Sequence, residues 1–337
     1  MNARWRNAVG VALSAGLLVW TLWGLDPAVV WGHLRAANLW YFFGAMVAGT
    51  LIFPLRARRW RTILDPIAPR LPFEQLWRAT AIGMMGNNLL PARAGEFARA
   101  YTLSRETSQV SFSAAFASLA VDRVFDAFVV LLLMLVAMAS PSFPDLPIGG
   151  RPVGDYVLGG AVVASAALGA LYLIVFFPQR ILTLYEWLVR RVAPRFEARG
   201  REALLAFASG LGVLRHPARF FAVLLWTIAH WLLNGVAFLF AFKAVGIAAP
   251  FSAALLLQGL IAIGVAVPSA PGFFGVFEKI GQVGLGLYGV DKALATSWAI
   301  GFHLLTFFPI TVIGIYYFGR LGLHFRDLKR AENADAP

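Results

Sequence analysis

Long runs of apolar residues, separated by short polar stretches, set the pattern of this chain. A helix rises about 1.5 Å per residue, so crossing a hydrocarbon core of about 30 Å takes about 20 apolar residues. Six runs meet that length: Ala8–Leu25, Ala37–Leu55, Phe112–Ala139, Tyr156–Phe177, Phe220–Phe242 and Ala293–Phe318. They predict an all-α integral membrane protein with about six spanning helices.

Two further apolar segments are each broken by a proline, which predicts re-entrant helical hairpins rather than spans. Each would enter the membrane as a half-helix, turn at a break, and leave as a second half-helix. Backbone broken at membrane depth is tolerated only where protein or a water-filled cavity satisfies its free polar groups. The segments are Phe73–Leu90 and Gly95–Arg105, which flank Pro91, and Phe251–Val267 and Phe273–Tyr288, which flank Pro268.

The basic residues collect in segments that would all lie on one side of these spans. Of the 29 Lys and Arg residues, 19 lie before the first run, directly after the second, between the fourth and fifth, or after the last. Those after the second run are Arg56, Arg58, Arg59, Arg61 and Arg70. The positive-inside rule then predicts cytoplasmic termini and a multi-pass protein of the cell (inner) membrane. We therefore interpret the net charge of +12 as the basic excess that orients the protein in the membrane and attracts anionic lipid headgroups. It does not indicate nucleic-acid binding.

The two hairpins are predicted to enter from opposite sides of the membrane. The first follows a cytoplasmic stretch, and the second follows a span that runs outward. A shift of 177 residues superposes three identical positions, with Pro91, Gly95 and Phe97 falling on Pro268, Gly272 and Phe274. We therefore expect one polytopic domain, residues 1–337, that contains an inverted-topology repeat of about 37–139 and about 218–318.

Residues 178–217, between the fourth and fifth runs, have an amphipathic pattern. Apolar residues recur there at helical spacing, at Ile181, Leu184, Tyr185, Leu188 and Val192. Pro194 ends this helix, and a second begins at Glu197. We expect both helices to lie flat in the cytoplasmic headgroup layer.

The break in the first hairpin carries polar residues that a membrane segment seldom contains. Residues 86–100 read GNNLLPARAGEFARA. The second arm begins near Gly95, and its free amide groups and positive dipole end favour an anion. Arg93 adds a guanidinium fork that suits phosphate, while Glu96 is placed to pair with Arg93 or Arg99.

Two interpretations of this stretch are open at the level of sequence. Because charges inside a membrane are usually functional, Arg93, Glu96 and Arg99 are candidate substrate-binding residues. Alternatively, these residues only cap and lock the hairpin. Asn87 and Asn88 are also candidates, although satisfying the broken backbone is the simpler role for them.

The third apolar run carries three charges within five residues. Asp122 and Asp126 share a helix face, and Arg123 is spaced to pair with Asp126. Burying these charges is expensive unless they face a cavity or one another. They are expected either to line the cavity, where two acids relay protons, or to form salt bridges with arginines of the first hairpin. No further ligand stands at metal spacing, so neither a metal nor another cofactor is expected.

The second hairpin has a similar break with fewer charges. Residues 267–281 read VPSAPGFFGVFEKIG and contain Gly272 and a single acid, Glu278. We expect Gly272 and Glu278 to face the cavity, and Lys279 to snorkel or pair. His230 and Asn234 are expected to make interhelical hydrogen bonds, and the glycines of residues 284–289 to allow close helix packing.

Three signatures in this chain resemble a known family. They are NNLLPARAGEFAR at 87–99, VDRVFDAF at 121–128 and VPSAPGFFGVFEKIG at 267–281. In order and spacing they are similar to the transmembrane, flippase-like domain of lysylphosphatidylglycerol synthetases, over roughly residues 8–318. The resemblance implies a cavity lined by re-entrant helices, through which the domain moves lipids between leaflets. Stand-alone relatives are linked to hopanoid, glycolipid or polyprenyl-lipid pathways.

The synthetases carry a soluble aminoacyl transferase domain after this region. Here Gly319–Pro337 follows the last run, so we expect a stand-alone member that performs no aminoacyl transfer. The expected function is flippase- or scramblase-like translocation of an anionic or modified phospholipid, glycolipid or polyprenyl-type lipid. The alternatives are a lipid-modifying membrane enzyme and an accessory subunit of a lipid-modifying complex. Assembly with a second copy or with a lipid-synthesis enzyme is left open.

Overall fold

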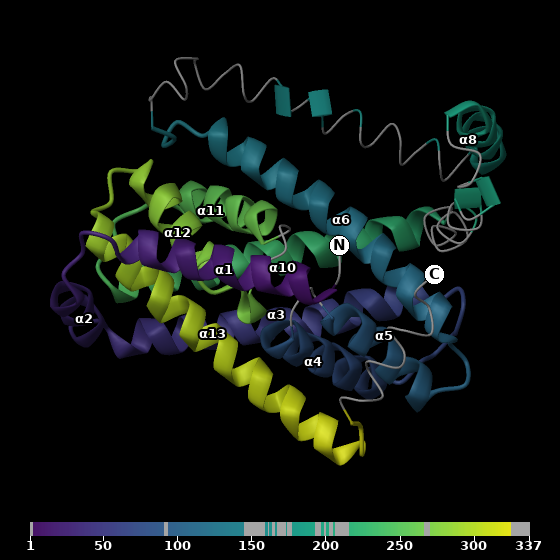
Figure 1. Ribbon diagram of the computed structural model, residues 1–337, viewed down its shortest axis with the longest axis horizontal. Helices are drawn as coiled ribbons and strands as arrows, with labels where there is room; N and C mark the ends of the chain where they lie inside the picture. The colour runs from purple at the N-terminus through teal and green to yellow at the C-terminus, as the bar shows by residue number, and fades with distance from the viewer. Residues whose placement is uncertain are drawn as a thin grey trace.

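The computed structural model describes residues 3–90, 94–144, 177–192, 216–265 and 270–324, together with several short stretches and single positions between 159 and 205. Within these residues the chain is all-helical and contains no strand, which confirms the predicted class. Figure 1 shows the helices gathered into one bundle. Their bounds are α1 Ala3–Leu22, α2 Pro27–Arg35, α3 Leu39–Leu64, α4 Phe73–Leu89, α5 Gly95–Glu106, α6 Phe112–Met138, α8 Pro178–Val192, α10 Pro217–Ala244, α11 Phe251–Gly264, α12 Val276–Gly286 and α13 Lys292–Arg320.

Three of these helices are long and apolar enough to cross a membrane. They are α3, α10 and α13, with 26, 28 and 29 residues, which corresponds to roughly 40 Å each. Their outward side chains are apolar, among them Leu39, Leu225 and Val312, as expected for a surface in contact with lipid. α6 is equally long, with 27 residues, but has three charges near its middle. These features are those of a helical membrane protein.

The first predicted run differs from the expectation. α1 ends at Leu22, and the chain turns by 83° into α2, so that the two helices form a bent pair. Two features make the turn: Gly24 adopts a positive φ of 71°, and the Asp26 carboxylate caps α2 by accepting from the Ala28 amide at 2.8 Å. The pair counts as a fourth candidate span if it is taken as one. The predicted run Tyr156–Phe177 lies almost wholly outside the described residues.

The two predicted hairpins are both pairs of short helices. α4 and α5 pack closely because Gly95 lies against α4, where an added Cβ would be 2.0 Å from the Gly83 carbonyl oxygen. In the second pair, α12 begins at Val276, three residues later than predicted. A 3₁₀ turn, Pro271–Phe273, occupies the intervening residues, and Gly272 and Gly275 adopt φ values of 68° and 84° that glycine alone tolerates readily.

The helix pairs pack on a central framework made by α3 and α10. α4 packs against α13 and α5 against α6, whereas α11 packs against α6 and α12 against α13. Figure 1 shows the pair α4/α5 (blue) and the pair α11/α12 (green) at opposite ends of the bundle. An aromatic cluster between α10, α12 and α13 fills much of the core, through Phe238, Phe242, Phe277, Trp298 and Phe302.

α8 confirms the amphipathic helix predicted for the start of residues 178–217. Leu184, Trp187 and Leu188 are exposed, and Arg191 lies over the Trp187 ring at 4.0 Å. Leu182, which the spacing did not select, is the buried residue of this helix. Most of the predicted second helix, from Glu197 onward, lies outside the described residues.

Candidate functional site

A cavity of about 710 Å³ lies between the helix pairs. Its volume falls in the range of about 300–1,000 Å³ that ligand sites usually have. Side chains from α3, α4, α5, α6, α10, α11, α12 and α13 line it, so both hairpins contribute. Four charged residues, Arg56, Glu96, Arg123 and Asp126, gather in one part of the wall. Most of the remaining wall is apolar and aromatic, including Phe53, Val130, Met134, Phe277, Phe302 and Phe307.

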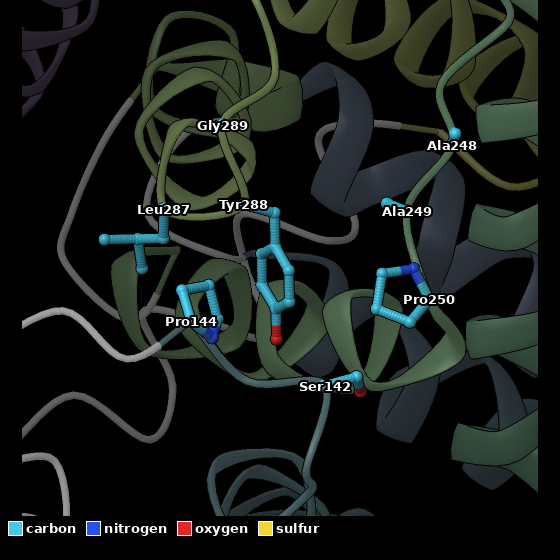
Figure 2. Close-up of a pocket in the computed structure, with 8 residues that line it drawn as sticks. All are labelled: Ser142, Pro144, Ala248, Ala249, Pro250, Leu287, Tyr288 and Gly289. Atoms are coloured by element: carbon cyan, nitrogen blue, oxygen red, sulfur yellow. The ribbon is translucent and has the colours of Figure 1, made fainter.

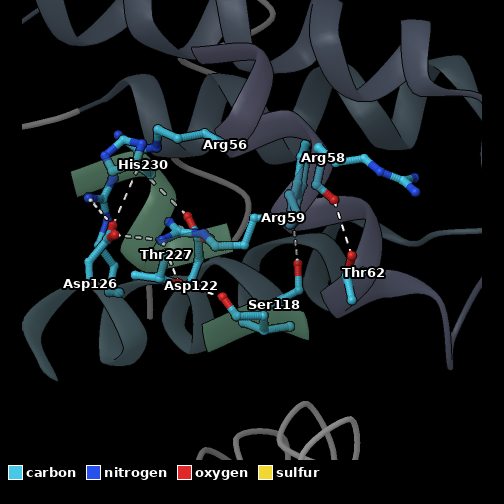
Figure 3. Close-up of polar contacts among 12 residues, drawn as sticks. Arg56, Arg58, Arg59, Thr62, Ser118, Asp122, Asp126, Thr227 and His230 are labelled. Atoms are coloured by element: carbon cyan, nitrogen blue, oxygen red, sulfur yellow. Dashed lines mark hydrogen bonds and ion pairs between the residues drawn. The ribbon is translucent and has the colours of Figure 1, made fainter. Parts of the chain in front are cut away.

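Arg59 stands at the centre of the charged cluster and is wholly buried. Its Nη2 lies 2.6 Å from Asp122 Oδ1, and its Nη1 donates to Asp126 Oδ1 at 2.7 Å. Nη1 also lies 3.1 Å from the Thr227 hydroxyl on α10. Figure 3 shows Arg59 between the two aspartates. The guanidinium therefore ties α3, α6 and α10 together.

Arg56, one turn earlier on α3, differs from Arg59 in its contacts. Its Nη2 is 3.7 Å from Asp122 Oδ2 and 3.8 Å from Asp126 Oδ2, which are ion-pair but not hydrogen-bond distances. Its side chain is only 9% exposed, and neither Nε nor Nη2 donates a hydrogen bond. Arg56 also lines the cavity, so a guanidinium that makes no short ion pair stands at its wall.

Two further arginines complete the cluster. Arg99 of α5 reaches Asp122 Oδ2 at 3.4 Å and lies over the Trp60 ring at 4.1 Å, a cation–π contact. Arg123 of α6 pairs with Glu96 of α5 and lies 3.5 Å from Asp126 Oδ2. The hairpin α4/α5 is therefore held to α6 by ion pairs as well as by packing.

The charges of this cluster do not balance. It contains four arginines and three carboxylates, so these described residues sum to one positive charge. An uncompensated charge in a low-dielectric interior is costly. A singly charged anion beside Arg56 would neutralise the cluster and accept hydrogen bonds from the Arg56 guanidinium. The cluster therefore has the properties of an anion-binding site.

The structure brings together five of the candidate residues named from sequence: Glu96, Arg99, Asp122, Arg123 and Asp126. The predicted Arg123–Asp126 pair is confirmed, and Asp122 does pair with an arginine of the first hairpin. Glu96 pairs with Arg123 rather than with Arg99. Arg93, the predicted phosphate ligand, lies outside the described residues, as does Pro91.

The two asparagines of the first hairpin differ in role. Asn88 donates to the Thr311 hydroxyl of α13 at 2.7 Å, which supports the simpler, structural role. Asn87 is buried with no hydrogen-bond partner for Oδ1, and both residues line the cavity.

Sequence reasoning missed Arg56 and Arg59, which were assigned to a cytoplasmic loop. That assignment is wrong because α3 continues to Leu64 and carries both arginines into the bundle. A signal for this was present: Ala57, Trp60 and Leu64 recur at i, i+3 and i+7, the spacing of a helix with one buried face. All three are fully buried.

In the second hairpin, Gly272 lines the cavity, but Glu278 does not. The Glu278 carboxylate accepts from the Gly275 amide at 2.6 Å and contacts His303 Nδ1 at 2.6 Å. These two contacts hold it behind the wall, and His303 takes the cavity position instead. Lys279 is paired, as expected, with Gln282 at 3.0 Å, and it lies over the Trp20 ring.

The remaining polar predictions concern helix packing. Asn234 donates to Gln258 at 3.0 Å, an interhelical hydrogen bond that confirms the expectation, and His230 Nδ1 lies 3.4 Å from the Ile52 carbonyl oxygen. Gly284 lies close to α11, where an added Cβ would be 2.5 Å from Leu257. Among the described residues, no three His, Asp or Glu side chains lie together as metal ligands would.

A second hollow, of about 700 Å³, lies where the loops before α11 and after α12 meet the end of α6. Figure 2 shows the Tyr288 hydroxyl directed toward its floor near Ser142. The described residues that line it are neutral: Ser142, Pro144, Ala248, Ala249, Pro250, Leu287, Tyr288 and Gly289. It lacks the charge pattern of the central cavity.

Comparison with known proteins gives the family. Residues 7–314 match the lysylphosphatidylglycerol synthase TM region. The chain is 27% identical over 333 residues to a UPF0104 membrane protein of Methanothermobacter thermautotrophicus, covering 92% of this chain and 93% of that protein. It is 24% identical over 325 residues to the UPF0104 membrane protein PH1989 of Pyrococcus horikoshii, covering 91% and 93%.

A partial match extends the comparison. Glycosyltransferase AglD of Haloferax volcanii is 32% identical over 179 residues, which make up 49% of this chain and 28% of AglD. The chain thus spans little more than a quarter of that relative. By contrast, the family match includes both hairpins, α6 and all three signatures, and takes in nearly the whole sequence. The chain therefore belongs to the family of the lysylphosphatidylglycerol synthase transmembrane region.

Proposed function

We propose that this protein moves an anionic lipid between the leaflets of a membrane. The observation that carries the proposal is the central cavity, which combines a buried, net-positive arginine cluster with a largely apolar wall. A lipid has the complementary chemistry, with a charged headgroup and hydrocarbon chains. Arg56 would bind the headgroup phosphate through its guanidinium, while the phenylalanines and Val130 contact the chains.

An inverted-topology repeat would give this cavity its alternating access. Shifted by 177 residues, α3 would cover 216–241 and α6 would cover 289–315, close to the bounds of α10 and α13. The packing is also reciprocal, since α4 contacts α13 while α11 contacts α6. A pseudo-symmetric cavity between two such halves is the plan of many transporters. In this proposal the hairpins are re-entrant, and six spans surround them.

The orientation we propose has both termini and residues 178–217 in the cytoplasm of a cell-membrane protein. Removing Arg56 and Arg59 from the basic set leaves 17 of the 29 basic residues on that side. α8 supports this placement, because its exposed leucines and Trp187 suit the headgroup layer beside anionic lipids. The charged cluster then lies toward the cytoplasmic end of the cavity.

The alternative of a lipid-modifying enzyme rests on the name of AglD and its partial match. The acids that an enzyme would use already have partners within the protein. Asp122 and Asp126 pair with arginines, and Glu278 contacts a backbone amide and His303. An accessory role in a lipid-modifying complex is the third candidate.

Reconstitution into liposomes tests the proposal. Purified protein is placed in phosphatidylcholine vesicles that contain fluorescent phosphatidylglycerol, and dithionite then bleaches the label in the outer leaflet. Translocation exposes more than about half of the label, whereas protein-free vesicles and vesicles with the Arg56→Met variant keep the inner half protected. Chromatography of the recovered lipid detects chemical change. A modified lipid would favour the enzyme, and unmoved, unmodified lipid would refute the translocator.

A further inference from the structure

His303 and Glu278 form a buried polar pair on the side of the cavity contributed by α12 and α13. His303 is 7% exposed and lines the cavity, while Glu278 is 2% exposed and lies behind it. Rings of Phe274 and Phe277 lie against the imidazole, each with its centroid 4.5 Å away. Apart from Glu278, no described charged side chain contacts His303.

The contacts of Glu278 determine which imidazole nitrogen faces the cavity. Its Oε2 accepts from the Gly275 amide, and its Oε1 lies 2.6 Å from His303 Nδ1, so the ionised carboxylate receives an N–H from each. The proton of a neutral His303 therefore sits on Nδ1. Nε2 then carries a lone pair, and it makes no hydrogen bond to any described residue. When His303 is neutral, its Nε2 is therefore a hydrogen-bond acceptor at the cavity wall.

A proton on Nε2 changes both the hydrogen-bonding role and the charge of the pair. Neutral His303 with ionised Glu278 carries one negative charge, which repels an anion. Protonated His303 gives a neutral pair and turns Nε2 into a charged donor that a phosphate oxygen can accept from. Binding of an anion and of a proton at this place are therefore linked.

The position of His303 mirrors that of the arginine cluster. The shift of 177 residues that superposes α6 on α13 places Asp126 on His303, and both residues line the cavity. The other charged or titratable residues that line it are Arg56 of α3, Glu96 of α5, Arg123 and Asp126 of α6, and His230 of α10. Lys279 points away, toward Trp20 of α1. Among the described residues that line the cavity, His303 is the histidine with both a carboxylate partner and a nitrogen that makes no hydrogen bond.

We propose that His303 is a second headgroup site, which binds a lipid phosphate only together with a proton. This inference rests on the proposed function and deepens it, since the lipid would leave the Arg56 site and reach His303 as a proton–anion pair. Transfer moves one proton from solvent to Nε2 and returns it when the headgroup departs. An imposed pH gradient would then drive translocation without any nucleotide.

Binding of dihexanoyl phosphatidylglycerol, a soluble singly charged phosphodiester, tests this site in the full-length protein in detergent. Calorimetric titrations in buffers of different ionisation enthalpy count the protons taken up per probe bound. The titrations are repeated at several pH values between about pH 5 and pH 8, the range in which histidine side chains generally change charge. Arg56→Met isolates the His303 site, and the affinity of this site for the probe should fall as the pH rises. His303→Gln keeps the Arg56 site and should bind with no pH dependence.

His230→Gln is the matched control, because His230 lines the same cavity without a carboxylate partner at hydrogen-bond distance. It should keep the proton uptake of the natural protein. If Arg56→Met does not fold, the comparison of natural protein with His303→Gln decides, and equal proton uptake overturns the site. Absence of binding in folded Arg56→Met, or pH-independent binding there, also overturns it. Translocation of labelled lipid without proton uptake would refute this site alone, and proton-linked binding without translocation would refute the proposed function alone.

Discussion

Arg56 and Arg59 offer a test of how the buried charges divide between structure and function. They are three residues apart on α3 and are both buried. Arg59 satisfies Asp122 and Asp126 at 2.6 and 2.7 Å, whereas Arg56 makes only ion pairs of 3.7 and 3.8 Å to the same acids. Replacing each by methionine keeps the apolar stem and removes the charge. The two variants should therefore fail in different ways.

Arg59→Met should destabilise the protein, because it leaves two buried carboxylates without their short contacts. Breaking a buried ion pair in this way costs about 3–5 kcal/mol. A second change, Asp122→Asn, removes one of the stranded charges and should recover part of the loss. The free energy of unfolding is measured by titrating the purified protein with SDS and following tryptophan fluorescence.

Arg56→Met should leave stability within about 1 kcal/mol, because its ion pairs are long and both aspartates keep their short contacts with Arg59. It should instead weaken binding of dihexanoyl phosphatidylglycerol at the Arg56 site. Hydrogen bonds to a charged group are worth about 1.5–3 kcal/mol, which corresponds to roughly a ten- to hundredfold loss of affinity at that site. This assignment of Arg59 to stability and Arg56 to binding would be refuted if both changes destabilised the protein equally. It would also be refuted if Arg56→Met bound the probe as tightly as the natural protein at every pH.

Two other features lead to direct tests. Gly95→Ala should destabilise the first hairpin and lower the thermal midpoint, because the new methyl group would meet the Gly83 carbonyl, while Gly286→Ala, with nothing within 4 Å, should change it little. The natural chain has no cysteine, so single cysteines report topology. Arg190→Cys should react with an impermeant maleimide only from the cytoplasmic side and Pro141→Cys only from outside. The reverse pattern would invert the proposed orientation.

Much of the helical architecture could be predicted because local patterns carry it. The apolar runs correspond to α3, α6, α10 and α13, and proline and glycine mark the two hairpins. The start of the second half-helix in the second hairpin was predicted three residues too early. Hydropathy does not distinguish a 3₁₀ turn with apolar side chains from the start of an α-helix. The 83° bend after α1 likewise depends on Gly24 and Asp26 rather than on hydropathy.

The site was predicted less completely, since its partners are distant in sequence. Arg59 looks like the basic end of a span until Asp126, 67 residues later, supplies its counter-ion. Likewise, Glu278 is the conspicuous acid of its hairpin, but His303, 25 residues later, takes the cavity position. A hydropathy pattern identifies which charges are unusual. Which of them are neutralised, and by which partner, is determined only by the tertiary fold.

The cluster around Arg59 also constrains how the protein is made. α3 is synthesised with four arginines in its C-terminal part, of which Arg56 and Arg59 are buried, and the aspartates that neutralise these two follow on α6. At about 5–20 residues per second, the 67 residues between Arg59 and Asp126 take roughly 3–13 seconds to appear. During that interval the arginine end of α3 is stable only at the headgroups, so α3 must settle to its final depth after α6 arrives. Insertion into the membrane would therefore include a delay before α3 reaches its final depth. We expect a chain that is truncated before α6 to hold α3 in a shallower position.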